Sequence, residues 1–377
     1  MEITYGHRIE TDEDPYLNLA REVDRMLNGS GNPGASPVDF FPILRHLPAW
    51  FPGAWFIRYG EENRPKTELM KDYGFNEVCR KMSAGTAEIS FLSMHLEQLI
   101  REGRDTEEER LRMRSAAFHL YGGDASRIFI SEDDSADLNY LSAGGETTWN
   151  STETFILAML VHPEAQKKAH AELDRVVGSG RLPDFSDRET LPYIDCIVQE
   201  TLRYVCDTNQ ISIRTSDFSD AHVVPFPNGR RYLVAPLGIP HRVMSDDVYR
   251  GMFIPKGSTI IANAACISMD EAVYHNPTAF FPERFLPKPE GHGEPYPELA
   301  FGFGRRICPG RHLADASIWI AVASILSVFD ILPAKDDSGN DIIPTPQFRT
   351  VVTSHPKPFK CIIRPRSAQA RALIEAI

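Results

Sequence analysis

The chain has 377 residues, of which 42% are hydrophobic and 24% are charged, a composition typical of globular proteins. This length is enough to bury a large core, so folding requires neither disulfides nor a structural metal. The formal net charge is −12. Because an acidic surface repels phosphates, we expect no nucleic-acid partner.

Neither the cysteines nor the apolar segments suggest a secreted or membrane-spanning chain. The six cysteines are scattered without a C-x-x-C spacing, which is typical of reduced intracellular thiols. The longest uncharged apolar run, Ala316 to Phe329, has 14 residues and is too short to cross a bilayer. The N-terminal segment lacks the apolar block of a signal peptide. We therefore predict a buried helix at Ala316 to Phe329 and no anchor.

The hydrophobic pattern predicts a mainly α fold. Predicted helical segments, in chain order, are Pro15 to Leu27, one or two within Arg64 to Arg101, Thr106 to His119, Thr148 to Val161, Pro163 to Gly178 and Leu191 to Tyr204. Strand patterns appear only later. Met252 to Ala264 alternates around a Pro-Lys-Gly turn and predicts a hairpin, and Phe359 to Pro365 predicts a short strand. With no repeat and no linker, residues 1–377 are predicted to form one domain.

One cysteine has neighbours that suggest chemistry. The pattern F-x-x-G-x-R-x-C-x-G is formed by Phe301, Gly304, Arg306, Cys308 and Gly310. Its glycines and Pro309 predict a tight loop, directly before the apolar helix. A thiolate at a helix N-terminus beside arginines is stabilised by backbone N–H groups and by the cations. The alternative is a buried structural cysteine.

Three further motifs occur in other parts of the chain. Glu200 and Arg203 form E-x-x-R, a spacing that places both on one helix face but usually gives an exposed pair. Arg284 lies in the segment FFPERFLP, and residues 143–148 read AGGETT. Small residues let a helix lie close to a flat ligand, and this hexamer adds an acid and a hydroxyl. The alternative is a Thr-rich helix start capped by its glutamate.

Together these motifs resemble those of the cytochrome P450 family and occur in the same order along the chain. The sequence is similar to the fungal microsomal type of the family. The resemblance implies haem b with Cys308 as the axial iron ligand. It implies that Glu146 and Thr147 are catalytic and deliver protons, and that Glu200, Arg203 and Arg284 form a buried network behind the cysteine loop. The other implied haem contacts are Phe301, Gly304, Gly310, Gly144 and, at the propionates, Arg306, His241 and Arg242.

The resemblance also implies an activity and partners. The expected function is a monooxygenase that hydroxylates a small to medium lipophilic substrate, of the kind found in secondary metabolism, with dioxygen. Residues 234–237 and 351–354 are expected to line the substrate pocket. Electrons are expected from NADPH-cytochrome P450 reductase, docked near Arg305, Arg306 and Arg311. The full-length family resides in the endoplasmic reticulum membrane, whereas this chain without an anchor is expected to be cytoplasmic if stable.

Departures from the family pattern define the competing interpretation. The chain matches roughly the C-terminal two thirds of the family domain and lacks the early helices. Residues 124–142 and 205–233 are predicted non-family insertions, and a retained intron accounts for either, since Val205 and Cys206 can be encoded by a splice-donor-like sequence. For the first of them the alternative is one long helix from Ser135 to Met159. The alternative function is thus an inactive fragment or mis-spliced product that keeps the motifs without a working haem pocket. A structural metal protein is disfavoured by the lack of zinc-like spacing at Cys308.

Overall fold

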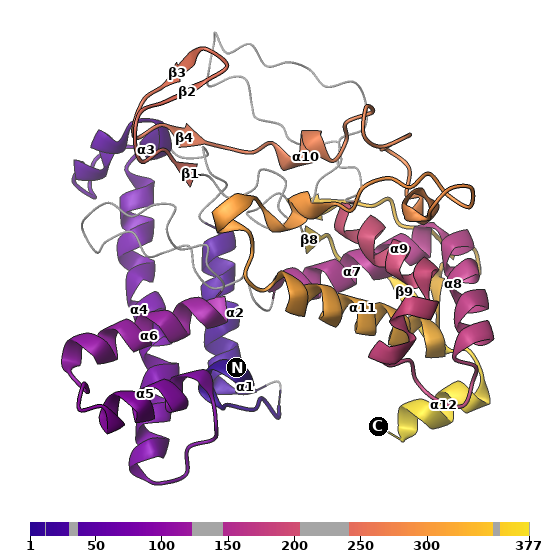
Figure 1. Ribbon diagram of the computed structural model, residues 1–377, viewed down its shortest axis with the longest axis horizontal. Coiled ribbons are helices and arrows are strands. Elements are labelled where there is room, and N and C mark those ends of the chain that lie inside the picture. Colours follow the sequence, from indigo (N-terminus) through magenta and orange to yellow (C-terminus); the bar gives the residue numbers. More distant parts are fainter. Residues whose placement is uncertain (12, 30–36, 123–145, 204–240, 350–354, 377) are drawn as a thin grey trace. The chain divides into compact units, whose positions relative to one another are not determined.

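The computed structural model describes residues 1–11, 13–29, 37–122, 146–203, 241–349 and 355–376. These residues form two compact units (Figure 1). The first contains Met1–Glu146 and Pro240–Thr259, and the second contains Thr147–Ile239 and Ile260–Ile377. Both predicted insertions, 124–142 and 205–233, lie outside the described residues, and the single-domain organisation stays a prediction.

The first unit is built mainly of helices. Its elements are α1 (Glu2–Tyr5), α2 (Pro15–Gly29), α3 (Pro37–Phe40), η1 (Pro42–His46), α4 (Trp55–Ser83), α5 (Phe91–Arg101), α6 (Glu107–Gly122), β1 (His241–Arg242), β2 (Asp247–Tyr249), β3 (Met252–Ile254) and, at its edge, β4 (Thr259–Ile260). Helices α2, α4, α5 and α6 enclose a core that includes Tyr16, Met70, Leu92 and Phe118. Helix α4 begins nine residues before the predicted Arg64 and carries Pro65 inside it.

The strands of this unit correct one prediction. The predicted hairpin had its turn at Pro-Lys-Gly, which would pair β3 with β4. In the structure β3 instead pairs with the preceding strand β2, and β4 pairs with β1. The turn between β2 and β3 is Arg250-Gly251, with φ values of +49° and +80°. Two successive positive φ angles match the right-handed twist of the flanking strands, which is why such two-residue turns close hairpins. The alternating pattern was read correctly, but it does not specify the partner strand.

The second unit holds most of the sequence motifs. Its elements are α7 (Glu146–Val161), α8 (Pro163–Val176), η2 (Phe185–Thr190), α9 (Pro192–Arg203), α10 (Ala264–Ile267), η4 (Pro282–Phe285), η5 (Glu298–Phe301), η6 (Gly304–Arg306), α11 (Arg311–Val328), β5 (Phe329–Lys335), β6 (Asp341–Ile342), β7 (Phe348–Arg349), β8 (His355–Pro356), β9 (Cys361–Pro365) and α12 (Ala368–Glu375). The described part of the chain is therefore mainly helical with small sheets, as predicted.

Helix α11 lies in the core of this unit, in contact with α8 and α9 (Figure 1). Ile318, Trp319, Val322, Ala323 and Leu326 are buried, and their spacing places them on one helical face. Among the described residues, α11 is the one helix that is long and apolar enough to cross a bilayer by composition alone. Its buried face instead identifies it as a core helix, in agreement with the sequence prediction.

Two polar side chains of α8 connect these elements, the buried Gln166 and the half-buried Glu172. The side-chain amide of Gln166, on α8, pairs with the backbone of Ile331 in β5. Its Nε2 donates to the Ile331 carbonyl oxygen at 3.0 Å, and the Ile331 amide donates to its Oε1 at 2.7 Å. Glu172, also on α8, accepts from the Tyr193 and Ile194 amides at 3.0 to 3.1 Å. A side chain of α8 thus caps the N-terminus of α9, where free N–H groups need acceptors.

We expect the substitution Gln166→Leu to destabilise the protein by about 1–3 kcal/mol, because it removes partners from a buried backbone N–H and C=O. Urea unfolding measures the loss. Gln369→Leu on the exposed face of α12 is the matched control and should leave the midpoint unchanged. Equal losses in the two variants would contradict the bridging role.

Candidate functional site

Cys308 lies in a tight loop between η6 and α11. Its amide donates to the Phe301 carbonyl oxygen at 2.8 Å, which closes the loop on itself. The amide and the guanidinium Nη1 of Arg311 contact the Cys308 carbonyl oxygen at 3.3 and 3.4 Å. Backbone hydrogen bonds therefore hold the cysteine from both sides at the start of α11.

Two glycines are required by the shape of this loop: Gly302, and Gly304 of the cysteine motif. Gly302 has φ +80° and ψ −161°, a region that side chains exclude, and Gly304 has φ +54°. Gly310 differs from the prediction, because its φ of −82° and ψ of 3° are accessible to any residue. A Cβ there would lie 3.9 Å from the Cys308 sulfur, an ordinary van der Waals distance, so the described residues leave space for a side chain at this position.

The surface around Cys308 combines apolar and basic side chains. Phe303 is 50% exposed and Leu313, one turn into α11, is 62% exposed. Arg305 and Arg306 are exposed as well. Large apolar side chains left at a surface beside a thiol are what a flat apolar ligand would cover.

The donor set at Cys308 restricts the kind of metal group that fits. Among the described residues, no three His, Cys, Asp or Glu side chains come together as a metal site. Within the described residues Cys308 is thus a single donor, and one thiolate is what a metal macrocycle takes from a protein. Cys196 offers no such site, because burial raises the pKa of its thiol to about 12 and keeps it protonated.

The structure brings Glu200, Arg203 and Arg284 together in the second unit. The Arg203 Nε and Nη2 donate to the two Glu200 oxygens at 2.8 and 2.7 Å. The Arg284 Nε donates to Glu200 Oε2 at 3.1 Å, and the Phe281 amide donates to Oε1 at 2.9 Å. All three side chains are fully buried. The carboxylate thus receives four hydrogen bonds in a water-free environment.

Both arginines also use their remaining donors. Arg203 donates to the carbonyl oxygens of Ser268, Pro277 and Ala279 at 2.9 to 3.2 Å. Arg284 donates to those of His275, Asn276 and Ala279 at 2.7 to 3.3 Å, and to a carboxylate oxygen of Glu294 at 2.8 Å. All five N–H groups of each guanidinium have acceptors, so the network fixes the path of residues 268–284 as well as α9.

A second ion-pair cluster, which the sequence analysis missed, connects α9 to the helix after the cysteine. Arg188 of η2 donates to Asp315 in the first turns of α11 at 2.6 Å. It also donates to Asp195 in the first turn of α9 at 2.7 and 3.0 Å. Only the folded structure identifies these partners, because Arg188 and Asp315 are 127 residues apart in the sequence.

The predicted catalytic pair lies at the start of α7. Thr147 is half-buried, and its carbonyl oxygen accepts a hydrogen bond from the Ser151 hydroxyl at 2.8 Å. Gly144 lies outside the described residues, and of Glu146 only the backbone is described. The segment predicted to be strongly apolar carries buried polar residues on the same helix: Asn150, Ser151 and Thr154.

His241 and Arg242 form β1 in the first unit, and both are exposed. The strand is held by hydrogen bonds just after it, from the Val243 amide to the Ser258 carbonyl oxygen and from the Gly257 amide to that of Val243. The Arg242 guanidinium lies over Gly257. Both residues stay predictions as propionate partners.

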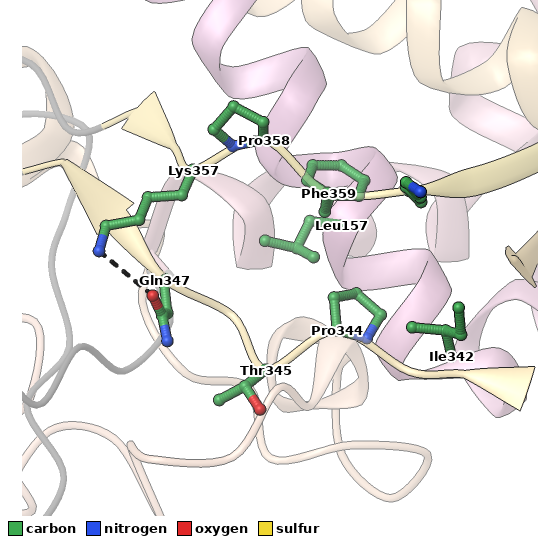
Figure 2. Close-up of a pocket in the computed structure, with 9 residues that line it drawn as sticks. Leu157, Ile342, Pro344, Thr345, Gln347, Lys357, Pro358 and Phe359 are labelled. Carbon is green, nitrogen blue, oxygen red and sulfur yellow. Dashed lines mark hydrogen bonds between the residues drawn. The ribbon is translucent and has the colours of Figure 1, made fainter. Parts of the chain in front are cut away.

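A separate small pocket of about 230 Å³ lies within the second unit (Figure 2). Leu157, Phe359, Pro344 and other apolar residues form its wall, and Lys357 donates to Gln347 at its rim at 3.2 Å. Among the described residues that line it there is no cysteine, histidine or carboxylate. The candidate site is therefore the Cys308 loop and not this pocket.

Comparison with known proteins gives one consistent family. The model of the family described as "Cytochrome P450" matches residues 80–214 and 230–363. The unmatched residues 215–229 fall inside the predicted insertion at 205–233, whose origin stays a prediction.

Similar fungal proteins match almost the whole chain. Cytochrome P450 monooxygenase 176 of Postia placenta is 35% identical, over 99% of this chain and 63% of its own length. A cytochrome P450 monooxygenase of Armillaria gallica is 37% identical, over 98% of this chain and 63% of its own. Cytochrome P450 monooxygenase claR of Ampulloclitocybe clavipes is 37% identical, over 100% and 61%. The chain spans less than two thirds of the length of these relatives.

We expect Arg203→Lys to destabilise the protein by about 3–5 kcal/mol, because lysine cannot supply five donors and leaves the buried Glu200 incompletely paired. The matched control is Arg80→Lys. Arg80 pairs with Glu77 through the same two hydrogen bonds and the same i, i+3 spacing, but its side chain is 67% exposed. Urea unfolding should show little change for the control. Similar losses in both variants would contradict the importance of burial.

Proposed function

This chain belongs to the cytochrome P450 family, and we propose that it is a haem-thiolate monooxygenase in which Cys308 is the axial ligand of the iron. The resemblance to fungal members is confirmed by the comparisons, and haem iron is the cofactor of the family. The observation that supports the proposal is the loop itself. It presents one half-buried thiol from a fixed backbone, beside exposed apolar side chains and among residues that offer no complete metal site.

The residues of this loop fit haem b. Cys308 would hold the iron, and Phe303 and Leu313 would cover part of the macrocycle with apolar surface. Arg306 is exposed and available to a propionate; His241 and Arg242 are the other proposed partners. Haem bound through a thiolate supplies the reactivity that activates dioxygen and oxidises a C–H bond.

The protein's own groups would control protons and access. We assign the Thr147 hydroxyl and the Glu146 carboxylate to proton delivery, since both stand at the start of α7, in the motif that small residues precede. They would hold water and pass protons without attacking the substrate. The Glu200 network would hold the thiol in place, because it fixes α9 and the segment that leads towards the cysteine loop.

The proposed substrate is a small to medium lipophilic organic molecule, and the proposed electron donor is NADPH-cytochrome P450 reductase. Arg305, Arg306 and Arg311 support the second proposal, because they place positive charge next to the cysteine of an acidic protein. Complementary charge steers such encounters and sets their orientation. The proposed location of the full-length protein, the endoplasmic reticulum membrane, is supported only by the resemblance to the microsomal type.

One observation favours a second candidate, an inactive fragment. The chain spans only 61–63% of the length of the relatives named above. If the parts of these relatives that the chain does not match contribute to their haem pocket, the motifs would persist here without haem uptake. Expression with a haem precursor separates the two candidates, since only the enzyme would take up haem.

We expect the reduced, carbon monoxide-treated chain to show the thiolate-shifted Soret band, and Cys308→Ala to abolish it, because alanine offers the iron no sulfur. Cys266→Ala, at an exposed cysteine on α10, is the matched control and should keep the band. Persistence of the band in Cys308→Ala would refute the ligand assignment. Absence of haem from the unsubstituted chain would support the inactive fragment.

A further inference from the structure

A fourth charged residue, Glu294, belongs to the buried network although no sequence motif contains it. Its carboxylate Oε2 accepts from the Arg284 Nη1 at 2.8 Å. Its Oε1 accepts from the His275 amide at 2.9 Å and lies 3.1 Å from the His292 Nδ1. The side chain is only 7% exposed. Glu294 is therefore a nearly buried member of the same hydrogen-bonded network.

The charge balance of the network depends on Glu294. Arg203 and Arg284 are two buried cations, whereas Glu200 supplies a single negative charge. A buried charge without a partner is strongly destabilising. Glu294 brings the total to two carboxylates for two guanidiniums and thereby makes the cluster neutral.

The position of Glu294 in the chain links this cluster to the cysteine. The Glu294 amide donates to the Arg284 carbonyl oxygen at 2.8 Å, so that backbone and side chain both hold η4. The next residue, Pro295, has a carbonyl oxygen 3.4 Å from the Tyr274 hydroxyl. The chain then runs through η5 to Phe301, whose carbonyl oxygen holds the Cys308 amide. Seven positions separate Glu294 from Phe301.

We infer that Glu294 is a positioning residue for the Cys308 loop. It neutralises Arg284 and anchors residues 294–301, the segment that leads into that loop. The catalytic importance of this positioning rests on the proposed function, in which the Cys308 thiol is the haem ligand. The anchoring itself concerns residues of this chain alone and is measurable without haem.

The groups that face the Glu294 carboxylate determine its acid dependence. Burial raises the pKa of this carboxyl, but the hydrogen bonds from Arg284, the His275 amide and His292 outweigh burial, so its pKa lies below the usual value. The stabilisation is therefore present above the pKa of the unfolded chain and is lost as the pH falls through the folded value. The other titratable groups around it are Tyr274, Glu200, Arg203 and the imidazole of His275, whose ring lies 5.2 Å from that of His292.

Thiol alkylation of the full chain tests the inference. We compare Glu294→Gln, which keeps the shape and removes the charge, with Glu298→Gln, an exposed carboxylate four positions further along the same segment. Iodoacetamide labelling is followed at each cysteine by mass spectrometry at pH 7. Exposed Cys266 reports the reagent's intrinsic rate, buried Cys196 reports global opening, and Cys308 reports the loop.

Glu294→Gln should raise the labelling rate of Cys308 on the order of 10-fold. This corresponds to a loss of about 1.4 kcal/mol in the free energy that keeps the loop closed. Cys266 should keep its rate, Cys196 should stay protected, and Glu298→Gln should match the wild type. A Cys308 rate that is unchanged, or that rises only in step with Cys196, overturns the positioning role.

Lowering the pH to 5 and below should reduce the difference in unfolding free energy between wild type and Glu294→Gln. A difference that stays constant with pH overturns the charge argument.

The haem-loaded protein separates this inference from the proposed function. In Glu294→Gln the thiolate-shifted carbon monoxide band should convert partly to the unshifted form, whereas Glu298→Gln should keep it. If the unsubstituted chain takes up no haem, the proposed function fails, while the labelling rates of Cys308 still decide whether Glu294 positions the loop.

Discussion

The second unit depends on one buried carboxylate, Glu200, placed between two arginines. Charges are costly to bury, and they become stabilising only when every donor and acceptor is satisfied. Here Arg203 and Arg284 use all five N–H groups each, mostly on backbone carbonyl oxygens of residues 268–284. An irregular segment without a regular helix or strand of any length is thereby fixed as firmly as a core element. The same segment continues into the loop that carries the cysteine.

The Cys308 loop follows this segment in the chain. Its own hydrogen bonds are short-range, from the Cys308 amide to Phe301 and from Arg311 to Cys308, and they shape the loop without placing it in the molecule. Placement comes from two sides: the Glu200 network before the loop, and the Arg188 ion pairs with Asp315 after it. In the proposed function Cys308 would hold the haem iron, and these distant contacts would then keep its sulfur in a fixed position.

The chain contains several E-x-x-R sequences, and two of them show why some of the site could be predicted from sequence and some could not. Glu77 with Arg80 and Glu200 with Arg203 have the same spacing and the same two-pronged hydrogen bonds. Only the order of the accompanying motifs singled out the second pair, because burial depends on what packs around a helix. Arg188 was missed for the same reason. The hairpin error had a related cause, since alternation predicts a strand but does not name its partner.

The sequence by itself determined the helical character, the cysteine loop and its glycines, and the family, because these follow from local periodicity, from backbone conformations that only glycine adopts, and from the fixed order of motifs. The tertiary structure decided which charges are buried and paired, and it added Glu294 and Arg188 to the site. Hydrogen bonds between residues far apart in the chain leave no local pattern, and their energy depends on the exclusion of water, which only the packed protein provides.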